Sequence, residues 1–149
     1  MNVKFKKLDP KSITPQFQNY GDVCADLSSI ISITIAPRTH SVVPTGIAIG
    51  LELGWEAQIR PRSGLAAKNG ISILNSPGTI DSGYRGEIKI ILMNNTDSPF
   101  TVKNGDRIAQ IAIREVPFIT FEEVENLDTT ERGANGFGST GIATLKQES

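Results

Sequence analysis

The sequence predicts an all-β fold, either a sandwich or a barrel. Three observations support this prediction. Almost every apolar segment is short and rich in β-branched residues, each is bounded by turn-forming residues, and no long helical pattern alternates with them. At 149 residues the chain has the length of one domain and is long enough to bury a core.

Seven apolar segments are expected to be strands, separated by clusters of glycine, proline, asparagine, aspartate and serine that favour turns. In chain order they are residues 30–35, 42–51, 55–59, 71–74, 87–94, 101–102 and 107–116. One segment departs from the pattern. Residues 63–70 contain the good helix-forming sequence Leu-Ala-Ala-Lys, with Ser63 as a plausible N-cap and Gly70 at the C′ position. We therefore expect one short helix there.

Two of the expected strands carry apolar residues on both faces. In residues 87–94 one face is apolar and the other becomes apolar at Ile91 and Met93, while residues 107–114 are largely apolar on both faces. This pattern indicates either an interface with another subunit or a sandwich core with a loop packed over its outside. Gln110 is the polar exception, and a buried amide needs a partner, so it either ties down a loop or meets a ligand.

The chain changes character near its C-terminal end. Residues 122–131 are acidic and lose the strand pattern, and residues 132–141 are studded with glycine. We therefore expect a β core at residues 1–121 and an extended C-terminal arm at residues 122–149.

Composition excludes several classes of function. The formal net charge of −1 argues against a protein that coats nucleic acid or a membrane surface, although local arginines still permit a small anionic ligand. The single cysteine, Cys24, excludes an intrachain disulfide, and the single histidine, His40, excludes a histidine triad or a multi-histidine metal site. No long apolar segment follows the N-terminal lysines. We expect a cytoplasmic enzyme or binding protein with no nucleic-acid or membrane partner.

The glycine-rich tail contains the parts of a clamp for a phosphate and a flat ring. Arg132 can bind phosphate through two hydrogen bonds, Ser139 and Thr140 can donate to phosphate oxygens, and Phe137 can stack on a base. A disordered C-terminus is the alternative. The tail is not a P-loop, because no lysine follows its glycines at the required spacing.

Two further segments carry candidate site residues. Arg62 and Ser63 lie where a strand meets the expected helix and can bind a phosphate there; alternatively, Ser63 only caps the helix and Arg62 is solvated. Residues 75–87 read as a hairpin whose backbone can pair with a base edge, with Asp81 as a candidate general base and Tyr84 against a sugar. The alternative makes Asp81 a turn-former and Tyr84 an interface aromatic.

Five segments in this order and spacing closely resemble the motifs of the homotrimeric dUTP diphosphatases (dUTPases). They are residues 26–29 (Asp-Leu-Ser-Ser), 61–66 (Pro-Arg-Ser-Gly-Leu-Ala), Asn75 with residues 78–87, 105–110 (Gly-Asp-Arg-Ile-Ala-Gln) and 132–141. The resemblance covers residues 20 to 141 and implies a jelly-roll-like β-barrel trimer with exchanged C-terminal arms. It implies hydrolysis of dUTP to dUMP and diphosphate with Mg²⁺, which supplies dUMP and keeps uracil out of DNA.

The resemblance also implies a role for each site residue. Asp81 would activate the water that attacks the α-phosphorus, and Asp26 would hold Mg²⁺ through water. The uracil edge would be read by Asn75 and by the backbone of Gly78, Thr79 and Ile80, with Tyr84 against the deoxyribose. The phosphates would be contacted by Arg62, Ser63, Gly64 and Gln110. A third subunit would close the site with Arg132, Phe137, Gly138, Ser139 and Thr140.

One departure from the family pattern is Cys24, which stands where these enzymes usually have a glycine two residues before the aspartate. Two other functions on the same fold are weighed against dUTP hydrolysis. A dCTP deaminase needs a carboxylate near the base, but the matching position here is Ile91. A catalytically inactive nucleotide-binding module is disfavoured because Asp81, Tyr84 and the tail are all present.

Overall fold

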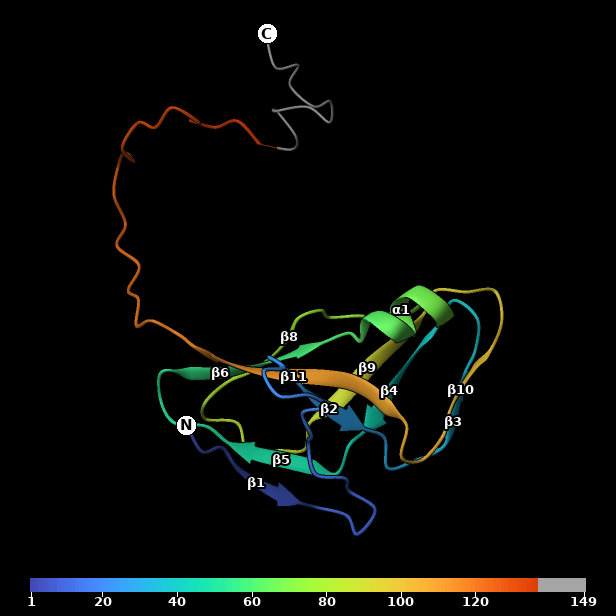
Figure 1. The fold of residues 1–149 in the computed structure, drawn as a ribbon. Helices are drawn as coiled ribbons and strands as arrows, with labels where there is room; N and C mark the ends of the chain where they lie inside the picture. The colour runs from blue at the N-terminus through green and yellow to red at the C-terminus, as the bar shows by residue number, and fades with distance from the viewer. Residues whose placement is uncertain (137–149) are drawn as a thin grey trace, which may run out of the picture. The chain divides into compact units, whose positions relative to one another are not determined.

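The computed structural model describes residues 1–136, and the chain forms two compact units, Met1–Phe118 and a second that begins at Ile119 (Figure 1). The first unit is built from short strands and one helix, which confirms the predicted all-β class. In chain order they are β1 (Lys4–Lys7), β2 (Ala25–Ser28), β3 (Ile33–Ile35), β4 (His40–Pro44), β5 (Ile47–Gly50), β6 (Trp55–Arg60), α1 (Ser63–Asn69), β7 (Ile71–Ile73), β8 (Gly78–Ile80), β9 (Lys89–Asn94), β10 (Phe100–Val102) and β11 (Arg107–Glu115).

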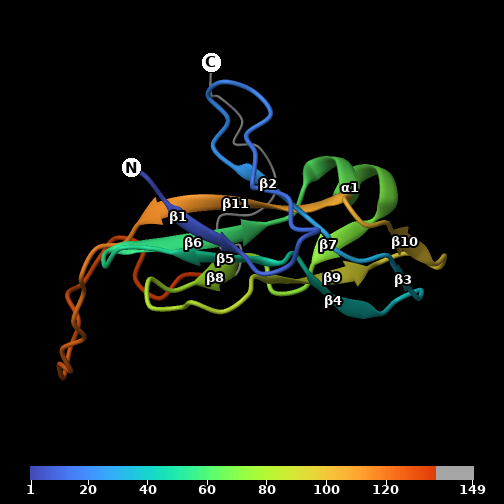
Figure 2. The same ribbon diagram turned by 90° about the horizontal axis from the view of Figure 1, so that it is seen from below.

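All strand pairs are antiparallel and form four small sheets. The largest has the order β2-β11-β6-β8, the next is β4-β9-β7, and β1-β5 and β10-β3 are two-stranded pairs. Figure 2 shows β11 and β6 running side by side, with α1 near one end of this sheet. Non-consecutive strands are neighbours throughout, so residues distant in sequence meet in the large sheet.

The core follows from the alternation of side chains along the strands. In and just before β9, Ile88, Ile90 and Leu92 are each only 1% exposed, which confirms their prediction as the inward face. The opposite face of the same sheet is apolar and open. Val42 and Leu74, which flank Ile91 on either side, are both 53% exposed.

Several boundaries differ from the prediction. Residues 42–51 form two strands, because the chain turns at Gly46, whose φ of 66° is in the left-handed region. The strands β1 and β2 were not expected. The predicted hairpin at residues 75–87 is wrong in one respect: its only strand, β8, pairs with β6 rather than with a returning strand.

The helix α1 begins at Ser63, the residue that was expected to precede it as the cap. Arg62, not Ser63, is the N-cap residue, and no side chain makes a capping hydrogen bond, so the prediction of Ser63 as N-cap is wrong. Gly70 ends the helix in the left-handed conformation at φ 64°, as expected. No helix within residues 1–136 is long and apolar enough to cross a bilayer.

Candidate functional site

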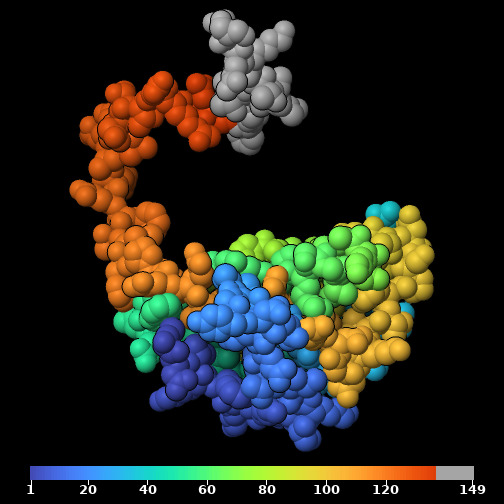
Figure 3. Space-filling model, viewed as in Figure 1, coloured from blue at the N-terminus to red at the C-terminus, as the bar shows by residue number. Residues whose placement is uncertain are grey.

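Antiparallel pairing brings three of the predicted site residues together. Asp26 on β2 lies directly opposite Gln110 on β11, and Gln110 lies opposite Arg60 on β6. Arg62 follows two residues after Arg60, at the start of α1. Residues from three separate motifs therefore meet where the large sheet joins the helix. In Figure 3 the loop before β2 (blue) and α1 (green) lie on the same face of this unit.

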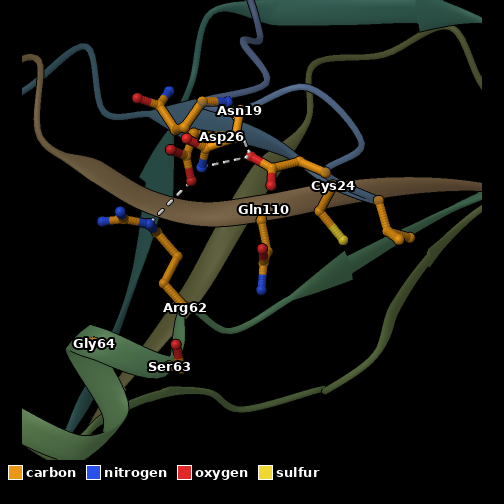
Figure 4. A pocket seen from close by; sticks show the side chains of 10 residues that line it. Asn19, Cys24, Asp26, Arg62, Ser63, Gly64 and Gln110 are labelled. Atoms are coloured by element: carbon orange, nitrogen blue, oxygen red, sulfur yellow. Dashed lines mark hydrogen bonds and ion pairs between the residues drawn. The ribbon is translucent and has the colours of Figure 1, made fainter.

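Asp26 is at the centre of this cluster and its side chain is only 11% exposed. Its Oδ1 pairs with Arg62 Nε at 3.0 Å, as Figure 4 shows, and its Oδ2 pairs with Arg107 Nη1 at 2.9 Å. Arg62 Nη1 also donates to the backbone carbonyl oxygen of Arg107 at 3.0 Å. Two guanidinium groups share one carboxylate, so the cluster keeps one formal positive charge and favours an anion.

Gln110 holds the segment that precedes the helix. Its Nε2 donates to the carbonyl oxygen of Pro61 at 2.8 Å, so it ties down a loop, which was one of its two expected roles. Its side chain also lines the hollow described next (Figure 4). The amide therefore fixes the backbone on which Arg62 and Ser63 are placed.

These residues line a surface hollow of about 330 Å³. Asp26, Arg62, Ser63, Gly64 and Gln110 form part of its wall. The remainder comes from the loop before β2, with lining residues Gln18, Asn19, Asp22, Val23 and Cys24. We call this the phosphate hollow.

Because Ser63 does not cap the helix, the interpretation that it serves only as a cap is wrong.

The sequence did not point to the loop before β2 as part of the site. Asp22 Oδ2 accepts hydrogen bonds from the backbone amides of Gln18 at 3.1 Å and Asn19 at 2.8 Å. This is the local turn chemistry that aspartate commonly makes. The Asp-containing polar sequence of the loop predicts a turn, but nothing in it predicts which surface the turn borders.

The segment with β8 lies on the other edge of β6. Gly78 is buried opposite Ile59, and a Cβ at Gly78 would come within 3.3 Å of both Asn75 Nδ2 and Ile59 Cβ. A side chain at Gly78 would therefore displace both the Asn75 side chain and the neighbouring strand β6. The exposed Thr79 and the half-buried Ile80 complete this strand.

Asp81 follows β8 and is exposed. Its carbonyl oxygen accepts from the Tyr84 amide at 3.0 Å, and no hydrogen bond to its carboxylate forms within residues 1–136. The Tyr84 hydroxyl donates to the Glu87 carbonyl oxygen at 2.9 Å. The Arg85 guanidinium donates to the carbonyl oxygens of Tyr84 and Leu51 and so helps to hold this loop.

Asp81 and the phosphate hollow are at opposite ends of β6. Asp81 lines a separate hollow of about 210 Å³ with Trp55, Glu56 and Phe118, at the start of that strand. Arg62 follows the end of the strand. The six residue steps from Glu56 to Arg62 span about 20 Å in extended chain. One chain therefore does not bring Asp81 and Arg62 together.

Arg132 belongs to the second unit, where its Nε donates to the carbonyl oxygen of Asn135 at 3.0 Å. Phe137, Gly138, Ser139 and Thr140 lie outside the described residues. The motif at residues 105–110 contains Arg107 but does not indicate a role for it.

Comparison with known proteins agrees with the sequence motifs. The dUTPase family model matches residues 11–141. The chain is 50% identical over 141 residues to the deoxyuridine 5'-triphosphate nucleotidohydrolase of Wolinella succinogenes, covering 95% of each chain, and 46% identical over 143 residues to that of Helicobacter pylori strain P12, covering 96% of this chain and 99% of the other.

Solved structures show the same fold. A mutant dUTPase of Staphylococcus bacteriophage 80alpha with dUpNHpp has a TM-score of 0.88 at 23% identity, covering 95% of this chain and 99% of the other. A mutant dUTPase of phage phi11 of S. aureus, described with a structural Mg(II) ion, has a TM-score of 0.80 at 20% identity, covering 87% of this chain and 100% of the other. The family model spans most of the chain and the first relative is half identical over nearly its full length, so this chain belongs to the dUTPase family.

Proposed function

We propose that this protein hydrolyses dUTP to dUMP and diphosphate in the cytoplasm, which supplies dUMP and keeps uracil out of DNA. The observation that carries the proposal is the phosphate hollow. Asp26, Arg62, Ser63 and Gln110 come from three separate sequence segments and line one small hollow, in which Arg62 is the cationic side chain. The relative from Wolinella succinogenes, half identical to this chain, is named for the same reaction.

The phosphate hollow is suited to the triphosphate end of the substrate. Arg62 can make charge-assisted hydrogen bonds to phosphate oxygens, and Ser63, the Gly64 amide and Gln110 add neutral donors. Because Asp26 is shared between Arg62 and Arg107, the cluster of these three residues keeps one formal positive charge before substrate arrives.

The segment around β8 is suited to the base and the sugar. Asn75 and the backbone of Gly78, Thr79 and Ile80 would pair with the uracil edge. The methyl group of thymine would overpack such a tight site at a cost of about 1–3 kcal/mol. The amino group of cytosine would leave buried partners unpaired, which is a stronger reason for rejection. Tyr84 would lie where a 2′-hydroxyl would otherwise fit.

Asp81 would act as the general base. Its carboxylate is exposed and has no competing hydrogen bond within residues 1–136, so it can accept a proton from water. The water oxygen then forms a bond to the α-phosphorus, the bond from that phosphorus to the bridging oxygen breaks, and diphosphate leaves. A placed base of this kind contributes roughly 10²–10⁴ in rate.

A Mg²⁺ ion bound mainly by substrate phosphates fits the residues present. Within residues 1–136 no three His, Cys, Asp or Glu side chains gather to form a protein metal site. Each carboxylate oxygen of Asp26 contacts one arginine and still has a free lone pair that can accept a hydrogen bond from a metal-bound water. When bound, the ion would neutralise charge on the phosphate oxygens.

The active site would be shared within a homotrimer. Asp81 and Arg62 of one chain lie at opposite ends of β6, so a complete site needs a second copy. The exposed apolar face around Val42 and Leu74 gives such a copy a surface to bury. The arm at residues 122–149 would reach a third subunit, where Arg132, Phe137, Gly138, Ser139 and Thr140 close over uracil and the γ-phosphate.

A product assay with Mg²⁺ and dUTP, dTTP, dCTP or UTP tests the base, the sugar and the reaction together. We expect dUMP and diphosphate from dUTP and little turnover of the other three. Conversion of dCTP to dUTP or dUMP would instead indicate a deaminase. Binding of dUTP without any product would indicate an inactive nucleotide-binding module.

Mixed trimers test whether sites are shared. Asp81→Asn and Arg62→Met chains, each inactive alone, would be co-expressed with different tags and purified through both. In a cyclic trimer each mixed assembly then has one site with both wild-type residues, so about a third of wild-type turnover should return. No recovery in verified mixed trimers would show that each site uses one chain.

A further inference from the structure

Arg107 is the one member of the charged cluster that does not line the phosphate hollow. The hollow is bordered by Asp26 and Arg62, whereas Arg107 borders two neighbouring hollows, one of which it shares with Asp26. Nevertheless it contacts both residues: its Nη1 pairs with Asp26 Oδ2 at 2.9 Å, and its carbonyl oxygen accepts from Arg62 Nη1 at 3.0 Å. Arg107 therefore contacts both charged residues of the cluster that line the hollow.

A β-bulge gives Arg107 this position. Along β11, Arg107 pairs with Ser28 and Ala109 pairs with the next residue of β2, Leu27, so Ile108 is the extra residue. In a regular strand, residues three apart such as Arg107 and Gln110 point to opposite faces. The bulge changes this alternation and turns Arg107 toward Asp26, which lies opposite Gln110.

We propose that Arg107 is a positioning residue for triphosphate binding: as the second counter-ion of Asp26, it allows Arg62 to leave Asp26 and bind phosphate. The proposal rests on the proposed function. The Asp26 side chain is nearly buried, so leaving its carboxylate without any counter-ion would destabilise the protein. With Arg107 present, Asp26 keeps one partner while Arg62 turns to the substrate. Without Arg107, Asp26 and phosphate compete for Arg62.

Binding of inorganic diphosphate in metal-free buffer, measured by calorimetry, tests this role without turnover. Arg107→Met should weaken binding about 10-fold. Arg107→Lys, which keeps the charge, should recover part of that loss. The matched control is Arg114→Met, on the same strand but exposed, opposite Glu56 and outside the hollow. Thermal unfolding of each variant reports whether it folds.

The decisive variant combines Arg107→Met with Asp26→Asn. Asparagine carries no charge to hold Arg62, so the double variant should bind diphosphate more tightly than Arg107→Met alone. A double variant that binds as weakly as, or more weakly than, Arg107→Met would overturn the proposal, because Arg107 would then contact phosphate itself or only stabilise the fold.

A second series with dUpNHpp separates this inference from the proposed function. A wild-type protein that binds diphosphate with the expected order of variants, but does not bind dUpNHpp, contradicts dUTP as substrate and supports the role of Arg107. Equal diphosphate affinity in wild type and Arg107→Met, with dUpNHpp bound normally, overturns the role of Arg107 alone. A wild type that binds neither molecule overturns both.

Discussion

Gly86 offers a sharp test of the sugar site. A Cβ at Gly86 would overlap the Tyr84 hydroxyl oxygen and lie 2.6 Å from Cζ of the same ring, so Gly86→Ala must displace Tyr84. The ring is 44% exposed and has room to rotate outward. The main structural loss is then the hydrogen bond from its hydroxyl to the Glu87 carbonyl oxygen. Such a bond contributes about 1 kcal/mol, so Tm should fall by roughly 2–4 °C.

The larger effect is expected on the choice between dUTP and UTP. If the Tyr84 ring excludes a 2′-hydroxyl by overpacking, it provides about 1–3 kcal/mol, roughly a 5- to 150-fold preference for dUTP. Gly86→Ala should lose most of this preference. The measurement is diphosphate release with both nucleotides, compared as the ratio of kcat/KM values.

Gly83→Ala is the matched control, because a Cβ at Gly83 meets no atom within 4 Å. It should leave both Tm and the dUTP preference unchanged. A Gly86→Ala protein with the wild-type ratio would refute Tyr84 as the residue that selects the sugar. An equal loss of preference in Gly83→Ala would show that any substitution in this loop disturbs the site.

Three further predictions concern catalysis, the arm and acid stability. Asp81→Asn should lower kcat by about 10²–10⁴ while the affinity for dUpNHpp is retained, since only the base is removed; equal losses of turnover and affinity would contradict this role. A chain that ends before Arg132 should stay folded, because Met1–Phe118 has its own core, and should lose most turnover; full activity would exclude a clamp. Arg38 lowers the pKa of Asp97 through a hydrogen bond and charge attraction. The stabilisation from a lowered pKa is complete above the unfolded value of about 3.9 and is lost as the pH falls through the lower folded value. The Tm advantage of wild type over Asp97→Asn should thus be present at neutral pH and disappear as the pH falls below about 4; a constant difference would refute it.

The fold class was predictable because burial imposes a period on the sequence. The alternation that ends in Ile90 and Leu92 could be read directly, since each inward residue is apolar. The strand β1 could not, because Lys-Phe-Lys-Lys has no apolar alternation and all four residues are exposed. Its place depends on pairing with β5, which is a tertiary interaction.

The break between β4 and β5 was hidden for a different reason. Thr45 is β-branched and lies in an apolar segment, which favours a continuous strand. In the structure its buried hydroxyl donates to the Ile88 carbonyl oxygen at 2.6 Å and accepts from the Ile47 amide at 3.3 Å. These bonds stabilise the turn at Gly46, which Pro44 and Gly46 favour locally but which the apolar residues on either side obscure.

The residues of the phosphate hollow were identified by motif, but their electrostatics were not. The family resemblance places Arg62 and Gln110 at the phosphates and Asp26 at the metal, but the pairing of Asp26 with two arginines is seen only in the structure. The place of Arg107 in this cluster could not be predicted for a further reason. Its spacing from Gln110 places it on the opposite face of a regular strand, and a bulge cannot be read from this sequence.

The two aspartates of the proposed site illustrate why geometry must precede the assignment of a general base. Asp26 Oδ2 accepts a charge-assisted hydrogen bond from Arg107 and Oδ1 forms an ion pair with Arg62, so its charge serves to organise its neighbours. Asp81 has an exposed carboxylate that accepts no hydrogen bond within residues 1–136, so a water molecule can reach it. A base must be within hydrogen-bond reach of the proton that it removes. The arrangement therefore favours Asp81 for proton transfer and Asp26 for holding charge, and in the proposed shared site the two would come from different chains.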